Sequence, residues 1–157
     1  MTVLIIIGIV MVAGFVLAVV AGIAVILLLG RASGWKNLAA RYLSRRAFPG
    51  TLRKVSHANL NNGSYSNVLR IGASEAGLHL AAASLFKVSH PPLDIPWEEI
   101  SMRAQQGAPG AAVHLDFGGN DASTLSIPLD AAVGLARDAE AWWEDGRKLL
   151  AAYPVVR

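Results

Sequence analysis

An unbroken apolar segment near the N-terminus limits what this chain can be. Residues 3–29, VLIIIGIVMVAGFVLAVVAGIAVILLL, carry no charged or strongly polar side chain in a protein of 157 residues. As a helix, a segment of this length rises about 40 Å, and the hydrocarbon core of a bilayer is about 30 Å thick. The segment is therefore predicted to be a transmembrane helix, which argues against a wholly soluble protein.

A cleaved secretory signal is the alternative to an anchor. Signal peptides begin with a basic region and have an apolar core of roughly 7–15 residues. Only Met1 and Thr2 precede the apolar run, neither is basic, and the run is much longer than a signal core. We therefore expect the helix to be retained as an anchor.

Charge is divided unevenly along the chain and predicts the orientation of the helix. Residues 1–74 contain eight Lys or Arg and no acid, whereas residues 75–157 contain eleven acids and six bases. The bases that follow the helix favour a cytoplasmic location for the C-terminal domain, with the N-terminus outside. The pI near 9.6 reflects this basic stretch, so a nucleic-acid partner is not expected.

Small residues form a row on the predicted helix. Gly14, Ala18 and Gly22 recur every four residues, a spacing that lets a second membrane helix approach closely. We expect this helix-packing face to bind a membrane protein partner or a second copy of the chain. The alternative is chance, because Gly and Ala are common in membrane helices.

A basic juxtamembrane segment, residues 31–49, follows the helix. Within it, Trp35, Leu38 and Tyr42 recur with the period of a short amphipathic helix. Trp favours the membrane interface, and Lys and Arg favour an anionic leaflet, so contact with lipid headgroups is expected for a set of five residues. These are Trp35, Lys36, Arg41, Arg45 and Arg46. Alternatively, the bases only set the topology, and Trp35 and Tyr42 pack on the domain.

The rest of the chain, residues 50–153, is predicted to be one antiparallel β sandwich or barrel of about seven strands. A turn at Asn61-Asn62-Gly63 and further breaks at 107–110 and 118–121 separate short apolar runs. The predicted strands are 51–60, 65–71, 77–82, 85–88, 93–102 (one strand or a pair), 113–117 and 123–127.

One long amphipathic helix over 129–152 is expected to cap these strands, which makes the fold class α+β. Its apolar seam includes Ala132, Leu135, Ala139 and Trp142. Trp142 is thus expected to be buried. Trp143 lies beside the seam, where it is either an ordinary helix edge or a possible contact for a protein partner.

Two local sequences resemble the pleckstrin-homology-like (PH/GRAM-like) domains of bacteria. They are Glu75-Ala76-Gly77-Leu78-His79-Leu80 and the run from Leu93 to Ile100, which contains Ile95-Pro96-Trp97. The whole chain also resembles small single-pass bacterial membrane proteins that join one anchor to such a domain. The resemblance implies a PH-like fold capped by its helix and a place in the bacterial inner (cytoplasmic) membrane. It carries no catalytic residues.

The sequence contains no arrangement typical of catalysis or metal binding. The chain has no Cys, and no His has a partner at metal-binding spacing on a predicted helix. A site that combines His79, His114 and Asp116 would require convergence across strands. Ser catalysis lacks a Gly-x-Ser-x-Gly turn. We therefore expect no catalytic residues, no metal and no cofactor.

These observations favour a non-enzymatic, membrane-anchored accessory or adaptor protein whose cytoplasmic domain binds a protein partner. The alternative is a sensor of anionic lipid headgroups that uses the juxtamembrane basic segment. A weaker alternative is an enzyme with a site between the sheet and the helix.

Overall fold

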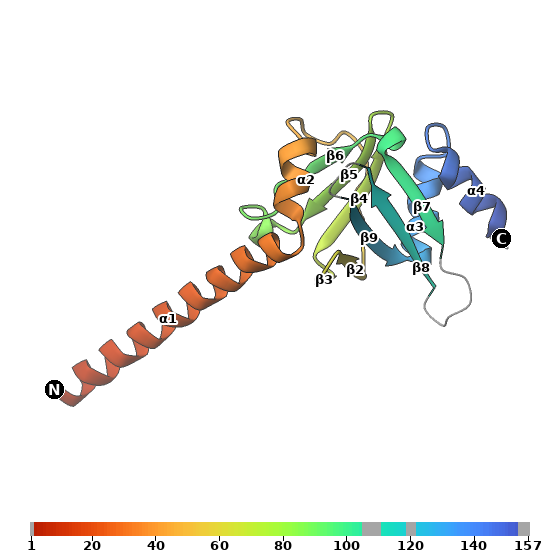
Figure 1. Cartoon of the computed structure of the whole chain (residues 1–157). Helices are drawn as coiled ribbons and strands as arrows, with labels where there is room; N and C mark the ends of the chain where they lie inside the picture. Colours follow the sequence, from red (N-terminus) through yellow and green to blue (C-terminus); the bar gives the residue numbers. More distant parts are fainter. Residues whose placement is uncertain (1, 105–110, 119–121, 154–157) are drawn as a thin grey trace.

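A long N-terminal helix projects from a folded β domain (Figure 1). The computed structural model describes residues 2–104, 111–118 and 122–153, so the predicted break at 107–110, and the one at 118–121 apart from Gly118, lie outside it. Helix α1 (Thr2–Ala32) contains a segment, Ile5–Val25, with a mean hydropathy of 2.9 and no buried residue. By length and composition this segment is able to cross a membrane. A single helix of this kind near the N-terminus is also compatible with a signal sequence.

The strands form two antiparallel sheets. The first sheet has the order β1-β4-β5-β6, and the second has the order β3-β2-β9-β8-β7. Their bounds are β1 (Arg53–Lys54), β2 (His57–Leu60), β3 (Gly63–Ser66), β4 (Leu69–Ser74), β5 (Gly77–Ala82), β6 (Leu93–Ile95), β7 (Ile100–Ala104), β8 (Ala112–Phe117) and β9 (Ser123–Pro128). The α+β class and the antiparallel pairing agree with the prediction.

The sheets contain nine strands rather than seven because several predicted strands bend from one sheet into the other. The run 51–60 divides into β1 and β2 at the buried Val55. The run 65–71 divides at Asn67, whose φ of 59° turns the chain between β3 and β4. A short 3₁₀ helix, η2 (Trp97–Glu99), separates β6 from β7.

One predicted strand is absent. Residues 85–88 were expected to be extended, but Ser84–Phe86 form a 3₁₀ turn, η1, in the loop between β5 and β6. The side chains of Leu85 and Val88 are exposed there, so they have no sheet face on which to pack.

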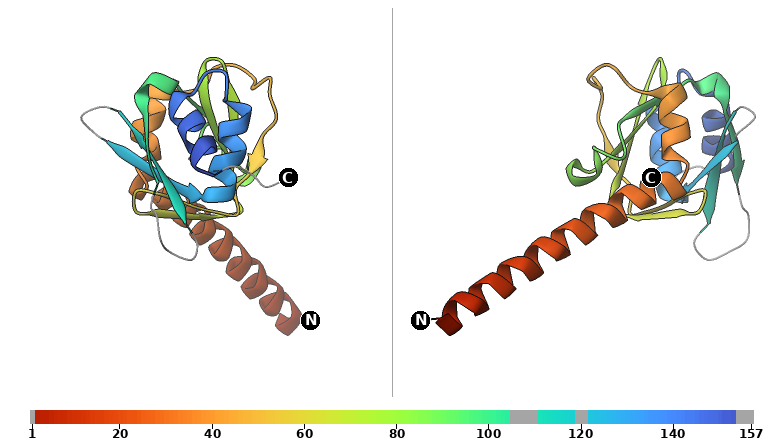
Figure 2. Two further views of the ribbon diagram at one scale, coloured as in Figure 1. Left: turned by 90° about the vertical axis from the view of Figure 1, so that its right-hand side faces the viewer. Right: turned by 60° about the vertical axis from the view of Figure 1, so that its left-hand side comes forward.

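Helices close the space between the two sheets, which share one hydrophobic core. Helix α3 (Leu129–Asp138) packs against β4 of the first sheet and against β8 and β9 of the second. Helix α2 (Trp35–Tyr42) contacts β6 and the end of α1, and it runs along the side of the domain (Figures 1 and 2). The juxtamembrane helix predicted near 35–46 is therefore present, but it belongs to the domain.

The single C-terminal helix predicted over 129–152 is wrong. The chain forms α3, turns at 139–142, and begins a second helix, α4 (Glu144–Ala152). Trp143 is extended, with φ −114° and ψ 106°, and it caps the N-terminus of α4. Two acids in the first turn of α4, Glu144 and Asp145, favour a helix start at this point.

Candidate functional site

The helix-packing face predicted on α1 is open in the structure. Gly14, Ala18 and Gly22 are exposed. A Cβ atom added to Gly14 or Gly22 would meet no atom within 4 Å. No described part of this chain covers the row, so a second helix has room to approach it.

The end of α1 is fixed to the domain by the β2–β3 hairpin rather than by a flexible linker. Ser33 is buried, and its carbonyl accepts a hydrogen bond of 3.0 Å from Asn61 Nδ2. Asn61 also holds β9, since its Oδ1 accepts the backbone N–H of Thr124 at 2.9 Å. A Cβ atom on Gly63 would lie 2.5 Å from Ser33 Cβ, so only glycine allows this approach.

The turn between α1 and α2 requires a second glycine. Gly34 has a φ of 75°, in the left-handed region that glycine adopts without strain. An added Cβ at Gly34 would also lie 2.7 Å from Asn61 Nδ2. The direction in which the domain leaves the helix is therefore set by local backbone geometry and close packing.

Trp35 is not a lipid contact, which corrects the sequence prediction. Its side chain is 0% exposed, and its Nε1 donates a hydrogen bond of 2.9 Å to the carbonyl of Pro91. Its ring packs edge-on against His90, with ring centroids 4.9 Å apart. The alternative, in which Trp35 and Tyr42 pack on the domain, is the one the structure supports.

The four basic residues of that predicted set remain exposed. Arg41 lies 3.5 Å from Glu99 Oε2, and the hydroxyl of Tyr42 donates a hydrogen bond to the same carboxylate. Burial raises the pKa of Tyr42, and the bond to Glu99 adds to the shift. The segment 43–52, which contains Arg45 and Arg46, continues from the end of α2 that is farther from α1 (Figure 1).

A buried polar chain lies behind Trp35. The Tyr65 hydroxyl is 3.0 Å from His90 Nε2, and Ser89 Oγ is 2.8 Å from His90 Nδ1. Burial lowers the pKa of His90, so the neutral ring is favoured, and burial raises the pKa of Tyr65. His90 and Ser33 are fully buried and are closed to a substrate. A side-chain hydrogen bond between Tyr65 and Ser33 links this polar chain to the residue that follows α1.

Trp143 is also misassigned by the sequence. It is only 2% exposed and stacks on Trp97 with ring centroids 5.2 Å apart, whereas Trp142 is 44% exposed. The turn after α3 rotates the chain, so that Trp143 rather than Trp142 enters the core. Trp143 is thus excluded as a surface contact for a partner. Its Nε1 has no hydrogen-bond partner in the described structure.

The histidine and aspartate candidates for a metal site are divided between the two sheets. His79 of β5 lies 2.6 Å from Asp94, while Asp116 of β8 binds Arg103 and Thr124. The hydrogen bond from Arg103 lowers the pKa of Asp116. Within the described ranges, no three His, Asp or Glu side chains are grouped so as to hold a metal.

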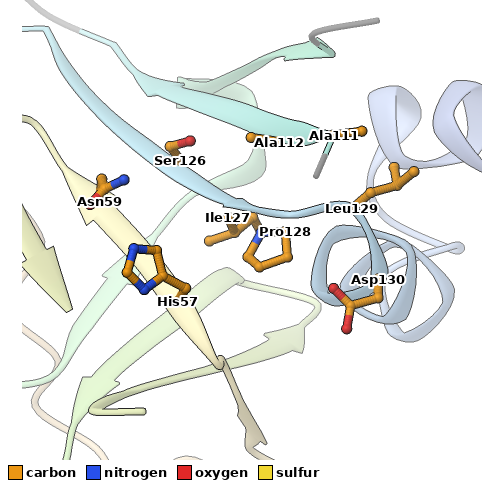
Figure 3. Close-up of a pocket in the computed structure, with 9 residues that line it drawn as sticks. All are labelled: His57, Asn59, Ala111, Ala112, Ser126, Ile127, Pro128, Leu129 and Asp130. Carbon is orange, nitrogen blue, oxygen red and sulfur yellow. The ribbon is translucent and has the colours of Figure 1, made fainter. Parts of the chain in front are cut away.

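One hollow of about 500 Å³ lies where β9 joins α3 (Figure 3). Among the described residues that line it, the titratable side chains are His57 and Asp130, which lie on opposite sides of Pro128 in Figure 3. His57 is bonded to Ser66 Oγ at 3.2 Å. A general acid and base must both reach the reacting atoms, and these two groups do not converge.

Comparisons with protein-family models, with curated proteins and with solved structures find no match for this chain. The interpretation of its function therefore depends on its own residues.

The segment 43–52 packs over the outer face of the first sheet through Phe48, a contact that the sequence did not predict. The Phe48 ring stacks on His79, with centroids 4.5 Å apart and an interplanar angle of 20°. A Cβ atom on Gly72 would lie 2.5 Å from Phe48 Cε1. The only sequence signal was the small residue in β4, which leaves room for a ring. Phe48 fixes the segment 43–52 over the outer face of the sheet.

Proposed function

We propose that this chain is a single-pass membrane protein that acts without catalysis, as an accessory or adaptor subunit. In this proposal, α1 remains uncleaved in the bacterial inner membrane, and residues 50–153, with α2 packed on them, form a PH-like domain on the cytoplasmic side. Two antiparallel sheets with helices at the C-terminal end are consistent with a PH-like domain.

The joint between α1 and the domain carries this proposal. A cleaved signal has an apolar core of roughly 7–15 residues, whereas Ile5–Val25 alone spans 21 residues and α1 continues as a helix to Ala32. Here Ser33 is buried directly after α1, and Asn61 and Gly63 hold it in place. Gly34, with its φ of 75°, then sets the direction in which the domain leaves a retained α1.

The partner is proposed to bind through the small-residue face of α1. A single-pass helix has no second helix in its own chain to cover Gly14, Ala18 and Gly22, and close packing of small residues drives association in lipid. The partner is a membrane helix of another protein or of a second copy. The buried Trp143 leaves no support for a partner site at that position.

The test replaces the small residues without changing the domain. A variant with Gly14→Ile, Ala18→Ile and Gly22→Ile is compared with a control that carries Val16→Ile, Val20→Ile and Ala24→Ile. The control positions lie on the opposite side of α1. Each protein is extracted in mild detergent from cells that hold two differently tagged copies, and its mass and bound proteins are measured.

The proposal predicts that wild type and control retain a stoichiometric membrane partner or a second copy, and that the first variant loses it. A wild-type protein that is monomeric and alone would contradict the proposal. Equal retention by all three proteins would exclude this face of α1 as the contact.

The lipid-headgroup alternative is weakened but not removed. It loses Trp35, which is buried, and Arg41 is paired with Glu99. Lys36, Arg45 and Arg46 remain exposed and are available to anionic lipid.

A further inference from the structure

The loop between β5 and β6 presents two apolar side chains to its surroundings. Leu85 is 83% exposed and Val88 is 90% exposed, more than any other large apolar side chain whose burial is described, α1 included. The transfer of apolar surface from water to an apolar phase is favourable in proportion to its area. Single exposed residues are ordinary, but two at the tip of one loop mark a surface that another apolar phase can cover.

The loop does not move freely, because its base is tied to the core. The backbone N–H of His90 donates to the Phe86 carbonyl at 2.8 Å, and the Phe86 ring packs edge-on against His90. Pro91, at the end of the loop, accepts the Trp35 indole N–H. Phe86 therefore turns inward, and Leu85 and Val88 are held outward.

The same contacts place the loop at the end of α1. Trp35 follows the last residue of α1 by three positions, and its ring lies 4.9 Å from that of His90. In Figure 1 and in the right-hand view of Figure 2, the loop, in light green, projects from the domain on the side where α1 leaves it. If α1 crosses a bilayer, the loop tip is directed toward the surface of that bilayer.

Three cations lie near the base of the loop. Arg46, Arg70 and Lys87 line a hollow of about 250 Å³ beside it, and no carboxylate is among the described lining residues. None of the three forms an ion pair with another described residue. Lys and Arg side chains near an anionic membrane surface are attracted to it.

We propose that this loop is a second membrane contact. Leu85 and Val88 enter the interfacial region of the bilayer beside α1, and Lys87 and Arg70 face the phosphates of anionic lipids. The proposal depends on the membrane-spanning role of α1, but not on the identity of a protein partner. With α1 and the loop both in the lipid, the domain is fixed at two points and is held in one orientation at the membrane.

The absence of Cys makes the test direct, because single cysteines can be labelled with an environment-sensitive fluorophore. The full chain is prepared as Leu85→Cys and as Val88→Cys, and is reconstituted in vesicles of phosphatidylcholine with phosphatidylglycerol. Phe15→Cys reports on α1, and Ala141→Cys, exposed in the turn between α3 and α4, reports on a surface outside the loop. Quenching is measured with aqueous iodide and with a doxyl group on the lipid chains.

Probes at 85, 88 and 15 are expected to be quenched by the lipid and protected from iodide, and the probe at 141 is expected to behave in the opposite way. Loop probes that iodide quenches as strongly as the probe at 141 overturn the proposal. Loop probes that are shielded from both quenchers also overturn it, because a protein surface then covers the loop. An iodide-accessible probe at Phe15 overturns the anchor and the loop contact together.

A second comparison tests the charges. The emission of the probe at 88 is expected to shift further to the blue in vesicles with phosphatidylglycerol than in phosphatidylcholine alone. This difference should shrink with added salt and with Lys87→Glu or Arg70→Glu. If the emission shift of the probe at 88 is the same with and without phosphatidylglycerol, at low and high salt, and in both substituted proteins, the assignment of Lys87 and Arg70 to lipid phosphates is overturned.

Discussion

The loss of unfolding free energy on replacement of Trp35 tests whether its side chain lies in the core of the domain or faces lipid. The indole is fully buried between α2 and His90, and truncation of a buried Trp to Ala costs about 3–5 kcal/mol. The lost hydrogen bond to the Pro91 carbonyl adds about 1 kcal/mol. Trp35→Ala should therefore remove about 4–6 kcal/mol, which is a large part of the 5–15 kcal/mol typical of a whole domain.

Trp142→Ala is the matched control, because Trp142 is the same residue type at 44% exposure. It should cost about 1 kcal/mol or less. The free energy of unfolding is measured by pulse proteolysis of the full chain in detergent with increasing urea, a readout that does not depend on tryptophan signal. Equal costs for the two substitutions would refute the placement of Trp35 in the core and restore it as a membrane contact.

Three further predictions follow from the same contacts. Gly63→Ala brings a Cβ atom to 2.5 Å from Ser33 Cβ and should cost about 1–3 kcal/mol, whereas Gly118→Ala, with 3.4 Å to its nearest atom, should cost less in the same assay. Trp143→Ala should destabilise the domain by about 3–5 kcal/mol, and a cost below 1 kcal/mol would place its ring outside the core. Because burial lowers the pKa of His90 below its unfolded value near 6.5, the stability should be full above about pH 6.5 and should fall as the pH falls below it. His90→Gln should flatten that part of the urea-midpoint profile, and an unchanged slope would show that His90 does not cause it.

Features that local sequence specifies were predicted well. The apolar run of α1, the amphipathic spacing of α2 and the Asn61-Asn62-Gly63 turn all occur where the sequence places them. Strands β5, β8 and β9 also agree closely with the predicted runs. In each case the signal is a periodicity or a turn residue, and no distant part of the chain is needed to interpret it.

Features that depend on tertiary packing were missed. A continuous helix over 129–152 would direct Trp143 away from the core, whereas the turn at 139–142 lets it stack on Trp97. The periodicity of 129–152 cannot predict that Trp143 is buried in place of Trp142, because Trp97 is far away in the sequence. The acids at the start of α4 were a local signal for the break.

The residues proposed to face the membrane could be predicted only in part. The period of α2 identified an apolar face, but the sequence did not show whether lipid or the sheets would cover it. Pro91 and His90, which cover Trp35, come from a loop more than fifty residues away. Residues 85–88 were likewise predicted to be a strand because Leu85 and Val88 are apolar. A bilayer contact for them is suggested only by the position of their loop beside α1, which the sequence does not show.

Retention of α1 in the membrane is the most direct test of this account. Membranes from cells that express the full chain are washed with alkaline carbonate, and the intact mass of the protein in the pellet and in the supernatant is measured. The account predicts a membrane-embedded protein whose mass includes all of α1. A carbonate-soluble protein that begins near residue 33, after removal of the apolar helix, would contradict it.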